Sequence, residues 1–331
     1  MSTIYSTFVM RNDSFIPGAL VFGYSLKKQG ITDPVICFVT DEVSPTAQGH
    51  LRHVFDEVVL IDSVEIPHPN LKGRQDRSFL FTRLEILKYT HYQGRKIEKI
   101  IVCDSDILPL ANYQDLKDIP SHGAILNESK DTTAVIENHQ YVISPAVLET
   151  GTWRWHEIYK DIPHGTKVPK SITDRVFTDE TNLGMNTSIW VFKPSKEMYQ
   201  TLMNDLAKED TQEKVQAYNW PEMQYLTGSL SGQWHNIDIK YASFNGYPRL
   251  DLVYGVHFAG VKPWAIQHRS FEHYSKFPDF RLWQAVFLKM MRDVKDLSHY
   301  PKLLRIKEVI YDQFKDEPVT PTERHHAPYW V

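Results

Sequence analysis

The chain has little cysteine and no long hydrophobic run. Cys37 and Cys103 are the only two cysteines among its 331 residues. Both lie in apolar stretches, so we expect buried free thiols, which are typical of a reducing compartment. No secretory signal is visible, and no apolar stretch reaches the roughly 18 residues of a membrane helix. These absences predict a cytoplasmic protein without a membrane partner.

Several nucleotide-binding and catalytic motifs are also missing. The turn after the first expected strand, at residues 11–15, contains no G-x-G-x-x-G, which argues against a dinucleotide site. The absence of a G-x-x-x-x-G-K-[ST] loop and of a G-x-S-x-G elbow argues against P-loop nucleotidases and α/β-hydrolases. The net charge of −4 gives no electrostatic reason for a nucleic-acid partner.

Strand and helix patterns alternate along the N-terminal third of the chain. Runs of β-branched residues predict strands, whereas apolar residues at helical spacing predict helices. The expected strands are residues 4–10, 35–40, 58–61 and 100–103, and the expected helices are residues 15–28, 44–55 and 79–89. This alternation is typical of an α/β fold with a mainly parallel sheet flanked by helices.

The pattern weakens between residues 127 and 181, which we interpret as an insertion. Its Trp153 and Trp155 would either offer stacking surfaces to a bound ligand or form a small local core. A strand at 185–192 and a helix at 195–206 follow, and helices at 279–294 and 302–314 precede a Pro- and His-rich tail. We therefore predict a main domain at residues 1–265 and a helical extension with its tail at residues 266–331.

The most informative motif is the pair Asp104 and Asp106, which follows the apolar run 100–103. In extended backbone, residues i and i+2 share a face, so both carboxylates should project together while Ser105 faces away. Two oxygen ligands at the carboxyl end of a buried strand suit a divalent cation. Taken alone, the D-x-D pattern is also compatible with an Asp-rich turn at a strand end.

A second cluster lies at residues 257–264. A neutral His257 imidazole is a good ligand for an ion such as Mn²⁺, and Lys262 can neutralise phosphate. Gly260 would let the backbone approach a ligand closely. Taken alone, His257 is better explained as a partly buried histidine in a strand, and Lys262 is also compatible with a lysine in a turn before proline.

With both clusters in view, residues 3–264 resemble the glycogenin-like members of glycosyltransferase family 8. The resemblance rests on ordered motifs at residues 12–21, 54–58, 82–84, 104–106, 186–195, 221–226 and 257–264. It implies a GT-A fold, in which a Rossmann-like, mixed and mainly parallel sheet is flanked by helices. The helical C-terminal extension lies outside the matching stretch.

The resemblance also implies roles for individual residues. It makes Asp104, Asp106 and His257 the metal ligands and Glu222 the carboxylate that acts as nucleophile or stabiliser at the transferred sugar. The residues implied to bind the donor are Phe8, Val9, Asn12, Phe15, Arg83, Asp104, Ser105, Asp106, Gly260 and Lys262, and those implied to serve catalysis are Glu222, Asn186 and Arg83.

The implied activity is hexose transfer from a UDP-sugar, UDP-glucose before others, with retention of configuration and with Mn²⁺, or Mg²⁺ in its place. The alternatives are a galactosyl- or N-acetylglucosaminyl-transferase on a small or glycan acceptor and, from another class, a nucleotide-sugar binding protein with little turnover. The acceptor, whether saccharide, small molecule or protein, is not named by the sequence. Dimerisation is an expectation from the family alone.

Three departures from the family pattern bear on this interpretation. Ser188 replaces a usual glycine and Met223 a usual glutamine, which puts the choice of sugar in doubt. The chain between residues 241 and 257 is shorter than in glycogenin. Its tyrosines, Tyr241, Tyr247 and Tyr254, are candidates for self-glycosylation, although strand tyrosines usually serve packing.

Overall fold

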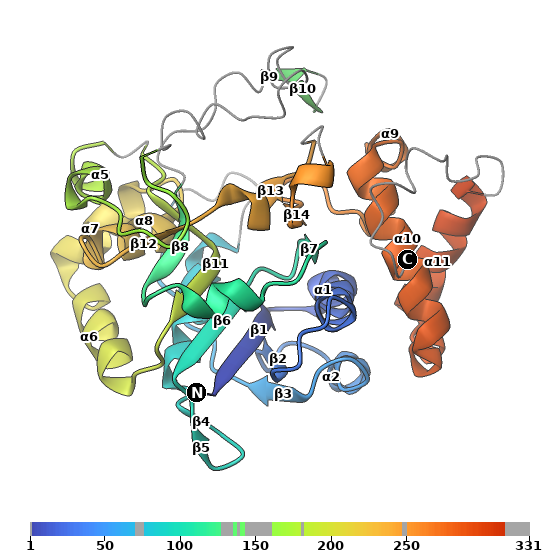
Figure 1. Cartoon of the computed structure of the whole chain (residues 1–331), viewed down its shortest axis with the longest axis horizontal. Helices are drawn as coiled ribbons and strands as arrows, with labels where there is room; N and C mark the ends of the chain where they lie inside the picture. Colours follow the sequence, from blue (N-terminus) through green and yellow to red (C-terminus); the bar gives the residue numbers. More distant parts are fainter. Residues whose placement is uncertain are drawn as a thin grey trace.

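The computed structural model describes residues 2–69, 76–126, 135–137, 140–142, 161–179, 182–246 and 250–314. Its centre is a seven-stranded sheet in the order β12-β8-β11-β6-β1-β2-β3 (Figure 1). The strands are β1 (Thr3–Val9), β2 (Val35–Val39), β3 (Glu57–Leu60), β6 (Lys99–Cys103), β8 (Gly123–Leu126), β11 (Met185–Phe192) and β12 (His235–Ile237). Each neighbouring pair is parallel except the two pairs that β11 makes, with β6 and β8. The predicted mixed, mainly parallel sheet is therefore confirmed.

A second, three-stranded sheet stands beyond the carboxyl end of β6. Its order is β13-β14-β7, with β13 (Ser243–Phe244), β14 (Gly255–His257) and β7 (Ile107–Pro109). Since β7 follows β6 after one turn, the chain passes directly from the large sheet to the small one. Two hairpins are separate from both sheets: β4 (His91–Tyr92) with β5 (Arg95–Lys96), and β9 (Val135–Glu137) with β10 (Gln140–Val142).

Helices cover the faces of the large sheet (Figure 1). The α-helices are α1 (Ile16–Lys28), α2 (Pro45–Leu51), α5 (Lys170–Thr173), α6 (Lys196–Leu206), α7 (Glu209–Ala217), α8 (Pro221–Ser229), α9 (Phe271–Tyr274), α10 (Pro278–Asp293) and α11 (Pro301–Phe314). The 3₁₀ segments are η1 (Asp13–Phe15), η2 (Arg77–Lys88), η3 (Gln114–Asp118), η4 (Asp174–Phe177), η5 (Ile239–Tyr241), η6 (Leu250–Leu252) and η7 (Lys295–His299). The helices predicted at 15–28, 195–206, 279–294 and 302–314 are confirmed within two residues, and the one predicted at 79–89 is 3₁₀ in form.

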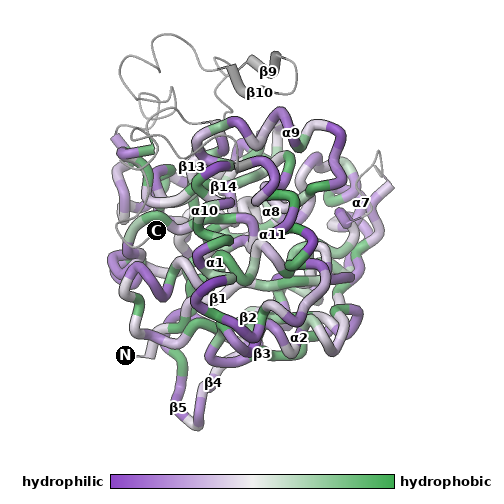
Figure 2. Tube along the Cα trace, turned by 90° about the vertical axis from the view of Figure 1, so that its right-hand side faces the viewer, coloured by the Kyte–Doolittle hydropathy of each residue, from purple (hydrophilic) through white to green (hydrophobic). Residues whose placement is uncertain are grey.

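Helix α1 is buried on every side from Ile16 to Leu26. Such a helix needs a cover on both faces, and in Figure 2 its tube is largely green, unlike the purple hairpin β4–β5. The sheet covers one face and α10 the other, where Tyr24 Oη donates to Asp293 Oδ2 at 2.6 Å (Figure 1). Farther along the extension, Lys302 Nζ donates to the backbone oxygen of Asp13 at 2.6 Å. The C-terminal extension thus completes the core around α1, while a domain boundary at residue 265 remains a prediction.

Other predictions concern buried thiols, membrane spans and three aromatic residues. Cys37 and Cys103 are buried and free, as predicted. Among the described residues, no helix combines the length and hydropathy needed to cross a bilayer. Trp153, Trp155 and Tyr247 lie outside the described residues.

Gly18 in α1 is required by close packing beside the Asp104–Asp106 turn. A Cβ atom at this position would collide with the backbone oxygen of Ser105 and with the Trp264 ring. We predict that Gly18→Ala destabilises the protein by about 1–3 kcal/mol, because overpacking a tight core forces backbone shifts. Urea unfolding followed by circular dichroism measures this loss.

The matched control is Gly49→Ala in α2. A Cβ there meets no atom within 4 Å, so the better helix propensity of alanine should stabilise the protein by up to about 1 kcal/mol. Equal unfolding midpoints for the two variants would contradict the packing assigned to Gly18.

Candidate functional site

The two aspartates converge, but not by the geometry that the sequence predicts. The Ile107 amide donates to the backbone oxygen of Asp104 at 3.1 Å, so residues 104–107 form a β-turn rather than an extended strand. The expectation of strand alternation is therefore wrong, although both side chains still reach the same neighbour, His257. A turn fits here because the chain changes sheets between β6 and β7. Ser105 is buried at the turn, with 6% of its surface exposed.

His257 completes a cluster with the two aspartates. It ends β14, which pairs with β7 so that His257 lies opposite Ile107. Its Nε2 is 3.3 Å from Asp106 Oδ1 and 3.8 Å from Asp104 Oδ2. One ligand atom from each of the three residues lies within 4.8 Å of the others.

The donor set of this cluster fits a divalent cation. Two carboxylates and an imidazole are ligands that Mn²⁺ accepts, and Mg²⁺ is bound by carboxylates. His257 Nδ1 is buried, and none of the described residues hydrogen-bonds to it. Among these residues, none therefore holds the ring in a tautomer that would prevent ligation through Nε2. Asp104, Asp106 and His257 would therefore hold the ion.

Lys262 reaches the cluster from the loop after β14. Its Nζ lies 2.6 Å from Asp106 Oδ2 and donates to the backbone oxygen of Phe258 at 2.5 Å. The same Nζ lies 5.5 Å from the ring centroid of Phe15. Lys262 therefore spans the space between the candidate metal ligands and the segment expected to hold the nucleotide.

Arg83, from η2, links the cluster to Glu222 of α8. Its Nη2 donates to Asp104 Oδ1 at 2.5 Å, and its Nη1 lies 3.4 Å from Glu222 Oε1. The guanidinium also lies over the Phe8 ring, 5.0 Å from the centroid. Since the side chains of Arg83 and Glu222 are 7% and 6% exposed, this is a buried ion-pair network.

Thr187 is a residue that the sequence analysis missed. Its backbone oxygen accepts from Arg83 Nη1 at 2.7 Å, and its hydroxyl donates to Glu222 Oε2 at 3.2 Å. The register of β11 against β8 shifts between Asn186 and Trp190, so the residues between them form an irregularity. Such bulges re-aim side chains beside functional sites. The Asn186-Thr187-Ser188 motif carries no sequence signal for this role, because the role of Thr187 depends on how β11 pairs with β8.

Burial and neighbouring charges shift the pKa values of these groups. Burial raises the pKa of Glu222, although Arg83 and the Thr187 hydroxyl oppose the shift. Burial also raises the pKa of Asp104, against the opposing charge of Arg83. For Asp106, burial is outweighed by Lys262 and His257, which hold its pKa well below the usual range. Arg83 remains charged, since Glu222 and Asp104 raise its pKa against the effect of burial.

The segment expected to hold the nucleotide runs from the end of β1, which pairs with β6, into η1. Val9 is buried, Phe8 and Phe15 are half-buried, and Asn12 is exposed. Asn12 Oδ1 accepts from the Ser14 amide at 2.8 Å and so caps η1. The carboxyl ends of β1 and β6 lie where the chain order reverses, which is where open α/β sheets bind ligands.

The last loop of the site brings Trp264 against this segment. Its Nε1 donates to the backbone oxygen of Ser14 at 2.9 Å, and its ring packs edge-on against Phe15 at 5.9 Å. Gly260 is exposed, and a Cβ there would meet no atom within 4 Å. Packing in the protein therefore does not require glycine at 260, and its role in approaching a ligand stays a prediction.

Asn186 lies in β11 next to Thr187 and is buried. Its Oδ1 accepts from the Ser188 amide at 2.9 Å. In turn the Ser188 backbone oxygen accepts from the Asp104 amide at 2.7 Å. Asn186, which is predicted to lie beside the transferred sugar, therefore supports the strand that holds the turn with the candidate metal ligands Asp104 and Asp106.

Two of the candidate acceptor tyrosines are engaged in packing. Tyr241 is fully buried and its hydroxyl donates to Asp115. Tyr254 is half-buried with Lys240 Nζ 4.3 Å from its ring centroid. Tyr241 could act as an acceptor only after local opening of the core.

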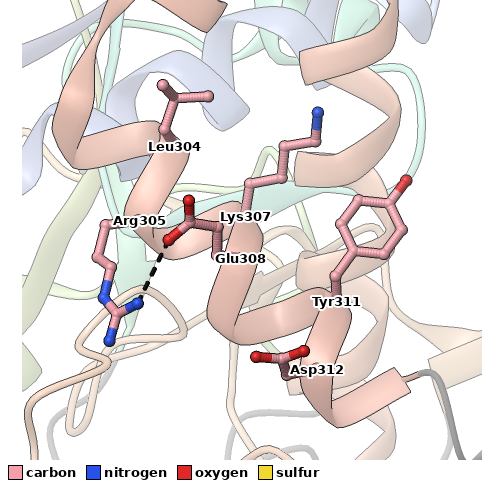
Figure 3. A pocket seen from close by; sticks show the side chains of 6 residues that line it. All are labelled: Leu304, Arg305, Lys307, Glu308, Tyr311 and Asp312. Atoms are coloured by element: carbon pink, nitrogen blue, oxygen red, sulfur yellow. Dashed lines mark hydrogen bonds and ion pairs between the residues drawn. The ribbon is translucent and has the colours of Figure 1, made fainter.

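A surface pocket lies along one helix, α11 (Figure 3). The lining residues all belong to this helix, and one ion pair, Arg305 Nη1 to Glu308 Oε2 at 3.3 Å, spans it. None of the predicted site residues lines it. The lining is formed by Leu304, Arg305, Lys307, Glu308, Tyr311 and Asp312.

No family model matches the chain. Comparison with known proteins found one relative similar over most of the chain and several glycogenins similar over about a third of it. An uncharacterized protein, R707 of Acanthamoeba polyphaga mimivirus, is 22% identical over 313 residues, which are 88% of this chain and 96% of that protein. Human glycogenin-1 is 36% identical over 110 residues, which are 32% of this chain and 30% of glycogenin-1. The chain therefore matches less than a third of the length of glycogenin-1.

Two solved structures share the fold. The apo structure of the bifunctional glycosyltransferase WbbM has a TM-score of 0.53 at 12% identity, over 93% of this chain and 51% of that one. The galactosyltransferase LgtC, in complex with donor and acceptor sugar analogs, has a TM-score of 0.50 at 12% identity, over 82% of this chain and 94% of that one. The predicted GT-A fold and the resemblance to glycogenin-like glycosyltransferases are confirmed.

The buried Arg83 network makes a prediction about stability. Arg83→Met would leave the Glu222 and Asp104 carboxylates without their common partner, and we expect a loss of about 3 kcal/mol in unfolding free energy at pH 7. Because the pKa of Glu222 rises further without Arg83, the loss should shrink as the pH falls toward about 4, where an unfolded glutamate also binds its proton. Urea unfolding at several pH values measures this.

The control is the double variant Arg83→Met with Glu222→Gln, in which the glutamine carries no charge to leave unpaired. It should recover part of the loss at pH 7 and show a weaker pH dependence. A loss that is the same at pH 4 and pH 7, or that is unchanged in the double variant, would count against an electrostatic role for the network.

Proposed function

We propose that the protein is a glycosyltransferase that transfers a hexose from a UDP-sugar, UDP-glucose in the first instance, with retention of configuration and dependence on Mn²⁺. The observation that carries the proposal is the convergence of the Asp104, Asp106 and His257 cluster with Lys262 on one side and the Arg83–Glu222 pair on the other. This convergence occurs at the point of the sheet where nucleotide-binding α/β folds place their ligands.

Each part of the site suits one part of a UDP-sugar. The Phe15 ring offers a stacking surface for the base, and Asn12, Val9 and Phe8 border it at the end of β1. Lys262 and Gly260 suit the diphosphate, as a point charge and as an open approach to the backbone. Glu222, which pairs with Arg83, and Asn186, which precedes Thr187 in β11, would border the hexose.

The chemistry of transfer requires negative charge to be stabilised on the departing diphosphate and positive charge at the anomeric carbon. A bound divalent ion supplies Lewis-acid stabilisation of the diphosphate. Lys262 and Arg83 would place further positive charge beside it, and the Glu222 carboxylate would stabilise the oxocarbenium-like carbon. Because both Glu222 oxygens are already engaged, by Thr187 and Arg83, direct attack by this carboxylate would require these contacts to be given up. This supports attack on the same face as departure over a covalent intermediate.

A second candidate is transfer of galactose or N-acetylglucosamine to a small or glycan acceptor. The fold shared with the galactosyltransferase LgtC over 82% of this chain favours it, as do Ser188 and Met223 in the predicted sugar pocket. A single hydroxyl epimer is distinguished by few contacts, so donor identity is a matter for measurement.

The rival from another class is a nucleotide-sugar binding protein with little turnover. Placement in the cytoplasm and dimerisation stay predictions.

The proposal is tested by incubating the purified full chain with a panel of UDP-sugars and Mn²⁺. We expect UDP release that depends on Mn²⁺ and is fastest with UDP-glucose, and intact-protein mass spectrometry reports self-glycosylation in the same samples. Asp106→Asn should lower UDP release at least about 100-fold, because it weakens a carboxylate ligand. Asp293→Asn is the matched control, since Asp293 is also paired with a lysine, at 2.8 Å, but lies outside the site.

Three outcomes decide between the candidates. Fastest release from UDP-galactose or UDP-N-acetylglucosamine would replace UDP-glucose as the donor. Metal-dependent UDP binding without release from any donor would favour the binding protein. Full activity of Asp106→Asn would contradict the metal assignment.

Glu222→Gln tests the carboxylate at the transferred sugar. The glutamine keeps the shape and can still accept from Thr187, but it loses the negative charge that stabilises a developing cation. We expect kcat to fall by about 100-fold or more while KM for the donor changes little. Steady-state kinetics of UDP release measures both.

The control for Glu222→Gln is Glu85→Gln. Glu85 is also a buried carboxylate, paired with Lys88 and hydrogen-bonded by Tyr199, but it is not among the site residues. A fall in kcat of similar size in both variants, or a pure rise in KM for Glu222→Gln, would remove Glu222 from the chemistry.

A further inference from the structure

The two oxygens of Asp106 have different partners. Oδ1 faces His257 Nε2 at 3.3 Å, and Oδ2 is held by Lys262 Nζ at 2.6 Å. Lys262 therefore occupies one of the two coordination positions that Asp106 offers to a cation. A divalent ion bound to Asp106 would be brought close to this ammonium, and two like charges on one carboxylate repel each other.

Arg83 also contacts a candidate metal ligand, but it is fixed in place. Its guanidinium is held by Asp104, by the Thr187 backbone oxygen and by Glu222, and only 7% of its side chain is exposed. Arg83 leaves Asp104 Oδ2 directed toward His257, at 3.8 Å from Nε2. A cation can therefore reach Asp104 without any movement of Arg83.

Lys262 has the freedom that Arg83 lacks. Its side chain is 19% exposed, and its ammonium donates to Asp106 Oδ2 and to the Phe258 backbone oxygen. A lysine stem of four carbons rotates readily, unlike the planar fork of arginine. The nearby Gly260 borders open space, and the Phe15 ring lies 5.5 Å from Nζ on the nucleotide side. The ammonium can thus leave Asp106 without unpacking the core.

We propose that Lys262 is a built-in competitor of the divalent cation, which holds Asp106 until a diphosphate offers the ammonium another partner. This inference rests on the proposed function, namely that the site binds a divalent cation and a UDP-sugar. In the absence of nucleotide, Lys262 lowers the affinity for the cation. When a diphosphate is present, Lys262 moves to it, the competition ends and the cation binds tightly.

The proposal makes cation and nucleotide binding reciprocal. If UDP raises the affinity for the cation, the cation must raise the affinity for UDP by the same factor. Removing the ammonium should therefore have two effects of opposite sign, tighter cation binding without UDP and weaker UDP binding with the cation. A lysine that served only as a phosphate contact would produce the second effect alone.

The test uses the metal-free full chain and measures free Mn²⁺ by electron paramagnetic resonance, at constant ionic strength, with and without UDP. Lys262→Met keeps the length of the stem and removes the charge. We expect its affinity for Mn²⁺ without UDP to rise about tenfold, and its affinity for UDP at saturating Mn²⁺ to fall about tenfold. Lys262→Arg retains the charge and should retain the weak Mn²⁺ binding of the unaltered protein.

Lys289→Met controls for the change in net charge. Lys289 is paired with Asp293 at 2.8 Å on α10, with 28% of its side chain exposed, so it resembles Lys262 outside the site. It should leave Mn²⁺ affinity within twofold. Circular dichroism and the unfolding midpoint establish that each variant is folded.

The outcomes separate this inference from the function on which it rests. If the unaltered protein binds Mn²⁺ and UDP but Lys262→Met binds Mn²⁺ no more tightly, competition by Lys262 is disproved and the proposed function stands. If Lys262→Arg gains Mn²⁺ affinity as much as Lys262→Met does, charge competition is also disproved. If the unaltered protein binds no Mn²⁺ with or without UDP, the proposed function itself fails.

Discussion

The site depends on one buried cation, the guanidinium of Arg83. It is nearly without contact with solvent, yet it is surrounded by the Asp104 and Glu222 carboxylates and the backbone oxygen of Thr187. A buried charge is tolerated only when its partners satisfy it closely. Arg83 therefore fixes the distance between Asp104 of the candidate metal cluster and the carboxylate expected at the sugar, although these groups come from the turn after β6 and from α8.

The elements around Arg83 hold Asp104, Thr187 and Glu222 in position to contact its guanidinium. The β11 irregularity frees Thr187 to face Arg83 and Glu222, while the Ser188 backbone oxygen accepts from the Asp104 amide. On the other side, the small sheet brings His257 opposite Ile107, one residue beyond Asp106. The turn between the two sheets is thus held by main-chain hydrogen bonds from both neighbours, which orient its side chains before any ligand binds.

The fold and part of the site could be predicted from the sequence. The features that could not be predicted depend on contacts between residues far apart in the chain. Helix and strand periodicity is local, so the alternation of the N-terminal third and the two C-terminal helices could be predicted. The pairing of Asp104 with Asp106 was predicted, but strand alternation is the wrong cause, because a turn that joins two sheets depends on the distant β14. His257 and Glu222 could be joined to the rest of the site only through the family resemblance, since the contacts His257–Asp104 and Arg83–Glu222 each span more than 100 residues. Arg83 is nearer to Asp104 in the chain, but no local pattern in the sequence pairs the two. Thr187 has no local signal, because its position depends on the register against β8.

The charges of the site indicate what it is built to receive. Three carboxylates, Asp104, Asp106 and Glu222, are set against the two cationic side chains of Arg83 and Lys262. These five groups together carry a net negative charge when ionised. A divalent cation alone would reverse this sign, whereas a cation together with a diphosphate would restore it. Joint entry of a cation and a diphosphate therefore leaves the net charge of these groups unchanged, whereas a cation alone would add positive charge beside Lys262 and Arg83. The arrangement therefore favours joint entry of the cation and the diphosphate, and it disfavours a site that is filled by the cation alone.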